Sequence, residues 1–334
     1  MSRTRFAPSP TGSLHVGNAL SAVASRRLGD WMLLRIDDTD PKRNVAGGEE
    51  AILRDLEWLG IAWDEGPVRQ SERGDAYRAA AERLGVDRFD GITLRREDGT
   101  ATYHLASVVD DAEFGITHVV RGFEHRANEV LHRRLHEALG TRPPEYVHHG
   151  LLLGDDGKKL AKRAAGATVA SLREAGIPAE AVRRYLEELD LPKHDVSYDL
   201  TRIRRLAVEA IADMSDAELA ERVGAPVHVV PVMRGARDLA EAREYAELIL
   251  RPPEQVSISA DETLERFREL RERANCSVEP DAAREIVREL KAVGGDLKAL
   301  RLALTGRERG PELWSVLAAL PRDEALRRVE AVRS

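Results

Sequence analysis

The chain has 334 residues, a hydrophobic fraction of 43% and a formal net charge of −7. This length predicts two or three domains with sizeable cores, and the acidic balance excludes a non-specific nucleic-acid coat, which would be basic. The single cysteine, Cys276, excludes an internal disulfide and a zinc site built from cysteines. No apolar run of about 18 residues predicts a membrane span, and the start of the chain, with Arg3 and Arg5, does not resemble a signal peptide. We therefore expect a soluble, cytoplasmic protein.

The first half alternates short apolar strands with helical stretches. Strands are expected at residues 4–7, 31–36, 116–120 and 145–149, and helices at residues 17–28, 48–59, 103–111 and 124–139. This alternation favours an α/β fold with a Rossmann-like, doubly wound parallel sheet. Ligands of such a sheet bind at the carboxyl ends of its strands.

The second half changes character. From Thr168 onward the residues follow a helical period, which predicts a helical bundle C-terminal half. Capping-box patterns at Ser215–Glu218 and Ser259–Glu262 are typical of helix starts. We expect the α/β fold to span residues 1–165 and to be followed by a helical bundle or two small helical modules.

The segment from Phe6 to Asn18 reads as a strand end, a Pro/Gly turn and a helix start. A helix N-terminus offers free N–H groups and a positive dipole end, which suit a phosphate. His15 lies at that end and could donate to a phosphate oxygen. An ordinary strand-to-helix connection with Ser13 as the helix cap is the alternative interpretation.

A second segment concentrates lysine. The chain has 44 arginines but only seven lysines, and three of the seven fall within residues 158–162, after a Gly/Asp turn. Lysine is a mobile point charge, which suits neutralisation of a departing pyrophosphate better than arginine's rigid fork does. The alternative is a solvated charged loop, and the bias toward lysine argues against it.

Taken together, these segments resemble the class I aminoacyl-tRNA synthetases. His15-Val16-Gly17-Asn18 resembles their "HIGH" signature and Lys159-Leu160-Ala161-Lys162-Arg163 their "KMSKS" loop. The blocks 5–12, 35–40 and 103–122 resemble the glutamyl-tRNA synthetase family in the same order. The resemblance implies a nucleotide-binding catalytic domain at 1–165, a helical stem-contact-like domain at 166–225 and a helical anticodon-binding-like domain at 226–334.

For glutamate, the resemblance implies that Arg5 and Arg121 bind the γ-carboxylate and that Asp37 and Tyr103 hold the α-ammonium. A guanidinium matches a carboxylate in geometry and charge, which supports the first pair. The remaining residues of the implied glutamate site are Ala7, Ser9 and Ser107.

For ATP, the resemblance implies that His15 and Gly17 face the phosphates and that Lys159 and Lys162 stabilise the transition state. These four form the implied catalytic set. The implied ATP site also contains Ser9, Glu124, Leu152 and Arg163. Each of these side chains could instead have a purely structural role, for example Arg5 in an ion pair or Tyr103 in the core.

Metal ligation is expected only for Mg²⁺ brought by ATP, with no protein-bound zinc. His132 and His136 share a helix but lack a His-Glu-x-x-His pattern. His148 and His149 are adjacent on a strand, so they face opposite sides. The implied partners are L-glutamate and tRNA(Glu), and we expect a monomer that does not bind membranes.

Three departures from the family pattern affect the hypothesis. Asp37 stands where the family has glutamate, and Ala161 where its loop has serine. The segment at 76–102, here called the connector, is much shorter than the family's acceptor-binding insertion and reads as a helix at 77–84 and a hairpin at 92–102 turned at Glu97–Thr100. Two alternatives therefore stay open: a paralogue that activates glutamate or an analogue for another acceptor, and a catalytically silent tRNA-binding relative.

Overall fold

The computed structural model describes residues 1–253 and 261–332. The chain forms two compact units, one from residues 1–174 and 182–200, the other from Ala175–Ala181 and the chain from Thr201 on. No helix in the described part of the chain is long and apolar enough to cross a membrane.

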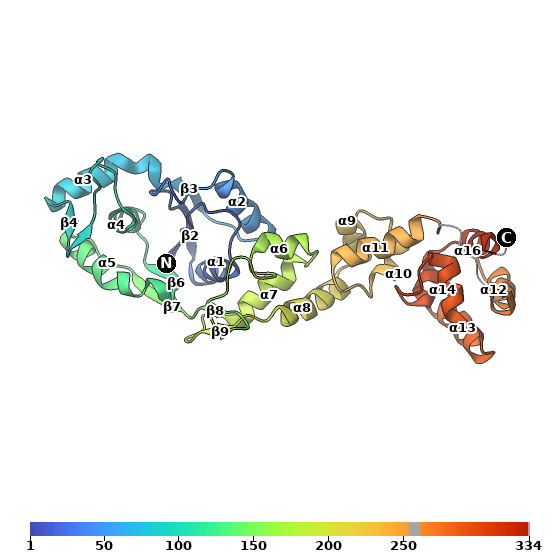
Figure 1. Cartoon of the computed structure of the whole chain (residues 1–334). Helices are drawn as coiled ribbons and strands as arrows, with labels where there is room; N and C mark the ends of the chain where they lie inside the picture. The colour runs from blue at the N-terminus through green and yellow to red at the C-terminus, as the bar shows by residue number, and fades with distance from the viewer. Residues whose placement is uncertain (254–260, 333–334) are drawn as a thin grey trace. The chain divides into compact units, whose positions relative to one another are not determined.

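The first unit carries all the strands of the described residues (Figure 1). Its elements are β1 (Arg3–Phe6), α1 (Val16–Leu28), β2 (Trp31–Ile36), α2 (Gly48–Trp58), β3 (Glu65–Arg69), η1 (Gln70–Arg73), α3 (Gly74–Leu84), β4 (Arg88–Phe89), β5 (Ile92–Thr93), α4 (Tyr103–Glu113), β6 (His118–Gly122), η2 (Phe123–His125), α5 (Ala127–Ala138), β7 (Glu145–His149), β8 (Leu152–Leu153), α6 (Val169–Glu174) and β9 (Val196–Ser197).

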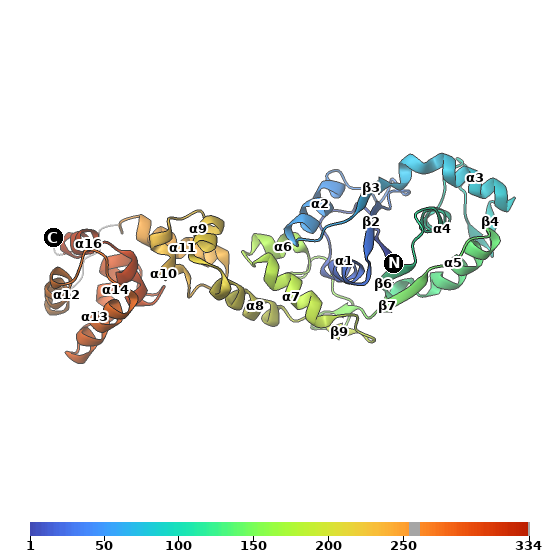
Figure 2. The same cartoon turned by 180° about the vertical axis from the view of Figure 1, so that it is seen from behind.

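The central strands are parallel and doubly wound, as the alternation predicts. β2 pairs with β1 and with β3, and β6 pairs with β7, all in parallel. β1 lies next to β6, because the Thr117 N–H donates to the Arg3 carbonyl at 2.8 Å and the Arg3 N–H donates to Thr117 Oγ1 at 2.8 Å (Figures 1 and 2). The strand order β3-β2-β1-β6-β7 therefore reverses between β1 and β6, and a ligand is expected at the carboxyl ends of these two strands.

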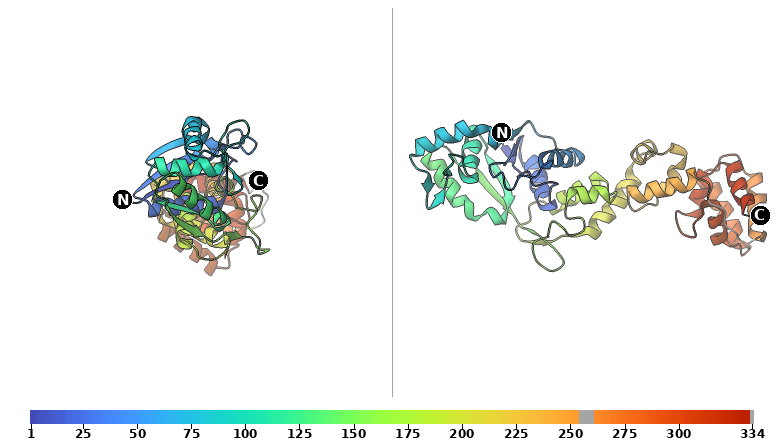
Figure 3. Two further views of the ribbon diagram at one scale, coloured as in Figure 1. Left: turned by 90° about the vertical axis from the view of Figure 1, so that its left-hand side faces the viewer. Right: turned by 45° about the horizontal axis from the view of Figure 1, so that its top comes forward.

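Most predicted elements are confirmed to within two residues. β6 starts at His118 rather than at Ile116, because the N–H of Ile116 donates to the Asp111 carbonyl and closes the turn after α4. The helix expected at 124–139 is divided into η2 and α5. Helices α3, α4 and α5 pack together around Tyr77, Leu105 and Leu135, and lie side by side, coloured cyan to green, in the right-hand view of Figure 3.

The connector contains one hairpin that the sequence analysis missed. β4 and β5 pair in antiparallel fashion around Asp90 and Gly91, whose φ angles of 50° and 77° suit a type I′ turn. The turn predicted at Glu97–Thr100 is present, since the Arg96 N–H donates to the Thr100 carbonyl at 2.8 Å. The hairpin expected over 92–102 is confirmed around this turn, with an antiparallel bridge between Arg95 and Ala101 and a hydrogen bond from the Thr102 N–H to the Leu94 carbonyl at 2.8 Å. Its first two residues also pair with β4 on their other side.

The second unit is helical, as predicted. α7 (Ala179–Leu189) begins in this unit, but its residues from Val182 on belong to the first unit. The helices that follow are α8 (Leu200–Asp213), α9 (Asp216–Val223), η3 (Val227–Val229), α10 (Val230–Met233), α11 (Leu239–Leu250), α12 (Asp261–Arg273), α13 (Pro280–Ala292), α14 (Leu297–Thr305), α15 (Leu313–Ala319) and α16 (Arg322–Ala331). Ser215 caps α9 by accepting from the Glu218 N–H at 3.2 Å, as predicted, whereas the Ser259–Glu262 box begins outside the described residues.

One apolar cluster runs from Ile211 to Val332 and forms the core of the second unit. It includes Phe267, Leu300 and Val316, all without exposed surface. The predicted boundary at residue 225, between two helical domains, stays a prediction.

Candidate functional site

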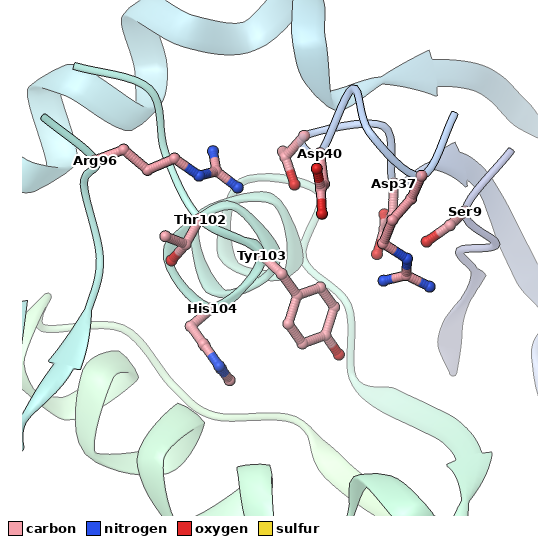
Figure 4. A pocket seen from close by; sticks show the side chains of 9 residues that line it. Ser9, Asp37, Asp40, Arg96, Thr102, Tyr103 and His104 are labelled. Atoms are coloured by element: carbon pink, nitrogen blue, oxygen red, sulfur yellow. The ribbon is translucent and has the colours of Figure 1, made fainter. Parts of the chain in front are cut away.

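A cavity of about 250 Å³ opens beyond the carboxyl ends of β1 and β2 and beside the first turn of α4 (Figure 4). Ser9 follows β1, Asp37 follows β2 and Tyr103 begins α4, so three elements bring together three of the predicted glutamate residues. The complete lining is Ser9, Asp37, Thr39, Asp40, Arg43, Arg96, Thr102, Tyr103 and His104. Ala7 lies half-buried between β1 and Ser9.

Asp37 accepts hydrogen bonds from a buried arginine, Arg35, to which the sequence analysis gave no role. Arg35 has no exposed surface, and its Nε donates to Asp37 Oδ1 at 2.7 Å. The guanidinium also donates to Asp111 Oδ1 at 2.9 Å and to Ser107 Oγ at 3.3 Å. Ser107 therefore contacts Arg35 and is not part of the cavity lining. Although burial opposes its charge, the surrounding aspartates raise the pKa of Arg35, so the guanidinium stays charged.

The same buried network reaches the start of the connector. Asp110 accepts from Gln70 Nε2 at 2.9 Å, from Arg73 Nε at 2.8 Å and from the Tyr77 hydroxyl at 2.9 Å. Its Oδ2 also lies 3.5 Å from Arg35 Nε. A charged residue inside the apolar strand Trp31–Ile36, and a double aspartate in the apolar stretch of α4, were the sequence signals for this network, because a buried charge needs a partner.

Arg121 lies at the carboxyl end of β6, beside the point where the strand order reverses. Only 5% of its surface is exposed, and its two terminal nitrogens are buried with no hydrogen-bond partner among the described residues. Its Nε donates to His148 Nε2 at 3.2 Å, and its guanidinium lies 4.6 Å from the centre of the Tyr146 ring. Burial lowers the pKa of Arg121, and the nearby charge of Arg5 acts in the same direction, while Tyr103 and Tyr146 oppose it.

Arg5 lies nearby on β1 but differs in its partners. Its Nε is 3.6 Å from Asp111 Oδ1, so a carboxylate of the buried network lies against it. Arg5 and Arg121 are close enough for the charge of the first to lower the pKa of the second. The structure therefore brings the two predicted carboxylate ligands into one cluster.

His15 is the N-cap of α1. Its Nδ1 accepts from the Gly17 N–H at 3.1 Å, so the proton of the neutral ring is on Nε2. That nitrogen is buried without a hydrogen-bond partner among the described residues, and burial lowers the pKa of the ring. The alternative cap, Ser13, instead donates to Asp55 Oδ2 at 2.6 Å. A neutral N–H donor thus stands at a helix N-terminus.

The lysine-rich loop lies against this turn. Lys162 Nζ donates to the Thr11 carbonyl at 2.8 Å, and Lys159 Nζ donates to Glu124 Oε1 at 2.6 Å. Burial opposes ionisation of Glu124, but the hydrogen bond from Lys159 lowers the pKa of this carboxyl overall. Leu152 is buried and its carbonyl accepts from the Leu160 N–H, whereas Arg163 is exposed.

The remaining histidines have separate partners. His132 Nε2 lies 3.1 Å from His104 Nδ1, and His136 Nδ1 lies 2.8 Å from Thr141 Oγ1. His149 Nε2 lies 2.7 Å from Ser21 Oγ on α1, on the opposite side of β7 from His148. Among the described residues, no three or more His, Cys, Asp or Glu side chains are grouped to hold a metal ion.

The chain matches a known catalytic domain over its first unit. The family model described as "tRNA synthetases class I (E and Q), catalytic domain" matches residues 1–87 and 85–203. The two matched segments meet inside the connector, where the sequence analysis expects a shortened insertion.

Two curated relatives match along the whole chain. Glutamate–tRNA ligase 1 of Rubrobacter xylanophilus is 33% identical over 424 aligned residues, which cover 99% of this chain and 97% of the relative. The glutamate–tRNA ligase of Akkermansia muciniphila is 32% identical, with 98% of each chain covered. Both alignments are longer than the 334 residues of this chain, so these relatives carry stretches that the chain lacks.

A solved structure shares the fold. The crystal structure of a glutamate tRNA ligase from Elizabethkingia meningosepticum in complex with its amino acid superposes with a TM-score of 0.79 at 22% identity, over 100% of this chain and 99% of that one. The family match covers more than half of the chain, and the curated relatives cover nearly all of it. The chain therefore belongs to the class I tRNA synthetases of the E and Q group.

Proposed function

We propose that this protein is a glutamate–tRNA ligase, which activates L-glutamate with ATP and transfers it to the 3′ end of tRNA(Glu). The observation that carries the amino-acid choice is the buried guanidinium of Arg121, whose terminal N–H groups have no partner in the described chain. A side-chain carboxylate of the substrate would accept a hydrogen bond from each of the two terminal nitrogens and would offset the charge of the guanidinium. A substrate with an uncharged side chain would leave the Arg121 guanidinium buried without a counter-charge, which is energetically unfavourable.

The other glutamate contacts follow from the same placement. Arg5 would share the γ-carboxylate with Arg121, while Asp37 and Tyr103 would hold the α-ammonium, and Ser9 and Ala7 would line the wall beside it. Ser107 would act through Arg35, to which its hydroxyl is hydrogen-bonded. Because Arg35 grips both oxygens of Asp37, at 2.7 and 3.3 Å, the shorter aspartate has a fixed orientation in the cavity.

For ATP, we propose that the phosphates bind at the N-terminus of α1. His15 Nε2 would donate to a phosphate oxygen, and Gly17 would allow close approach. Lys159 and Lys162 would exchange their present oxygen partners for phosphate oxygens, with Glu124, Leu152 and Arg163 completing the site. The donors here are an imidazole N–H and ammonium groups, which fit phosphate and do not fit a cation, so Mg²⁺ would come with ATP.

The reaction then proceeds in two steps. An α-carboxylate oxygen of glutamate attacks the α-phosphorus of ATP, the bond to the bridging oxygen of pyrophosphate breaks, and glutamyl-adenylate forms. Lys159 and Lys162 offset the charge that develops on the departing pyrophosphate. A hydroxyl of the terminal adenosine of tRNA next attacks the acyl carbon and AMP leaves, with the hydroxyl proton released.

Pyrophosphate exchange with glutamate and ATP, with and without bulk tRNA, tests this proposal. We expect glutamate-dependent exchange together with charging of tRNA. No exchange under either condition would refute the enzymatic function and favour a silent tRNA-binding relative. Because the connector is short, a second candidate is a paralogue that serves another acceptor, and exchange without charging of any tRNA would support it.

A further inference from the structure

His148 lies between Arg121 and Glu129. Its Nε2 accepts from Arg121 Nε at 3.2 Å, and its Nδ1 faces Glu129 Oε2 at 3.6 Å. The imidazole, from β7, thus lies between a guanidinium of β6 and a carboxylate of α5. Since Nε2 is the acceptor, the proton of the neutral ring is on Nδ1, toward the carboxylate.

This arrangement is unlike that of the other buried arginines in the cluster. Arg35 is surrounded by three aspartates, and Arg5 lies against Asp111. Arg121 instead has a neutral nitrogen at its Nε and an aromatic face 4.6 Å away. A carboxylate is nevertheless near, because Glu129 lies just beyond the imidazole, where it accepts from Arg133 Nε at 2.8 Å.

We propose that His148 is a positioning residue that separates Arg121 from Glu129 and so keeps the guanidinium free for the substrate carboxylate. A direct ion pair between Arg121 and Glu129 would turn the terminal nitrogens away from the substrate and neutralise the charge that attracts it. The imidazole prevents this in two ways: it occupies the space between the two groups, and its Nε2 holds Arg121 Nε in place.

Tyr146 supports the same orientation. Its ring contacts the guanidinium through a face, which stabilises a cation without offering it a competing anion. The side chains of Tyr146 and His148 alternate with Val147 along β7, so both lie on the face of the sheet that carries Arg121. One strand therefore provides two of the neutral contacts of the arginine, and Tyr103 of α4 is a further neutral neighbour.

This inference rests on the proposed function, and the test separates the two. KM and kcat for glutamate are measured by pyrophosphate exchange in four variants. We expect His148→Leu to raise KM for glutamate about tenfold or more, with a small change in kcat, because Arg121 turns toward Glu129. His148→Gln, which can place an amide oxygen near the position of Nε2, should stay within about threefold of the wild type.

The third variant tests the separation directly. His148→Leu combined with Glu129→Gln removes the competing carboxylate, and we expect it to recover much of the lost affinity. The control is His118→Gln, since His118 Nε2 faces Glu145 at 3.5 Å across the same pair of strands but far from the cavity. It should leave both constants unchanged.

The outcomes are distinct. Absence of exchange in the wild type refutes the proposed function itself. With exchange present, an unchanged KM in His148→Leu, an equal fall of kcat in the leucine and glutamine variants, or no recovery in the double variant would each overturn the role of His148. Thermal unfolding of every variant identifies a loss of folding; if His148→Leu does not fold, a KM in His148→Gln that rises by more than about threefold would overturn the role of His148.

Discussion

Lys162 Nζ donates a hydrogen bond to the Thr11 carbonyl at 2.8 Å, although the two residues lie 151 positions apart in the chain. The contact joins the lysine-rich loop to the turn before α1, the two segments that the sequence analysis singled out. The partner is a neutral carbonyl, which a phosphate oxygen can replace without leaving a buried charge unpaired. The ammonium group therefore lies at the proposed phosphate site and can exchange its partner there.

Replacing Lys162 by alanine should slow adenylate formation about a hundredfold or more, because an ammonium group that neutralises the departing pyrophosphate acts chiefly in the transition state. KM for glutamate should change less than about threefold, since the lysine does not contact the amino acid. Pyrophosphate exchange measures both constants. Lys158→Ala, an exposed lysine of the same loop, is the control. Equal effects of Lys162→Ala on kcat and on glutamate binding would refute the transition-state role.

Replacing Arg96 by alanine should weaken the binding of tRNA and leave the rate of adenylate formation unchanged. The connector places this guanidinium in the cavity lining, where its hydrogen bonds go to Thr100 Oγ1 and the Ala101 carbonyl (Figure 4). A cation at this rim would attract a phosphodiester of the acceptor, so its loss should raise KM for tRNA about threefold to tenfold. Arg95→Ala is a matched control, because Arg95 is paired with Asp87 at 2.6 Å. An equal effect of the two substitutions on charging would contradict the prediction.

Removing one carboxylate from the buried ion network should destabilise the first unit. Asp110 has no exposed surface, and it accepts from Gln70, Arg73 and Tyr77. Asp110→Ala would remove one of the three aspartates around Arg35 and take the acceptor from the Gln70 amide and the Tyr77 hydroxyl, and we expect a loss of about 3–5 kcal/mol in the free energy of unfolding.

Urea denaturation followed by tryptophan fluorescence measures this loss, since three of the four tryptophans, Trp31, Trp58 and Trp63, lie in the first unit. The exposed Asp155 offers a control, and Asp155→Ala should change the free energy of unfolding by less than about 0.5 kcal/mol. Similar midpoints for the two variants would show that the network does not stabilise this unit.

Stability should fall as the pH is lowered below about 6.5, because buried neutral histidines must be protonated on unfolding. Burial lowers the pKa of His132 from 6.5 to about 2 and that of His125 from 6.5 to about 4. The unfolded chain binds more protons than the native one between these values, so stability is complete above 6.5 and decreases toward acid. Each such histidine contributes a slope of at most about 1.4 kcal/mol per pH unit.

The measurement is the free energy of unfolding at several pH values between 7.5 and 5 for the wild type and two variants. His132→Gln should flatten the dependence, whereas the exposed His228, replaced in the same way, should not alter it. A dependence that is as steep in His132→Gln as in the wild type would show that another group is responsible.

The order of the elements could be predicted because local patterns are strong in this chain. The apolar run Trp31–Ile36 predicts a buried strand, and the Ala/Leu period after Gly17 predicts a helix that the structure confirms. The connector hairpin was missed because the Asp90–Gly91 turn joins strands of only two residues, too short to show alternation. Boundaries such as the start of β6 depend on hydrogen bonds to distant residues, and local pattern does not contain them.

For the candidate site, residue types pointed to segments that the fold brings together, but not to the partners of each side chain. Ser9, Asp37 and Tyr103 do line one cavity, and Arg5 and Arg121 do lie together. That Arg35 also donates to Asp111 and Ser107 of α4, and that His148 lies between Arg121 and Glu129, are contacts across strands and helices. Such contacts depend on side-chain packing, which spacing along the chain does not reveal.

The sequence by itself determined the elements, the acidic balance and the concentration of lysine at residues 158–162, because these are properties of composition and local period. The tertiary structure alone decided which charges are offset. It surrounds Arg35 with aspartates, places Lys162 against the Thr11 carbonyl, and leaves the terminal nitrogens of Arg121 without a partner in the described chain. A charge is neutralised only by groups within a few ångströms, and only the folded chain brings residues from different elements that close.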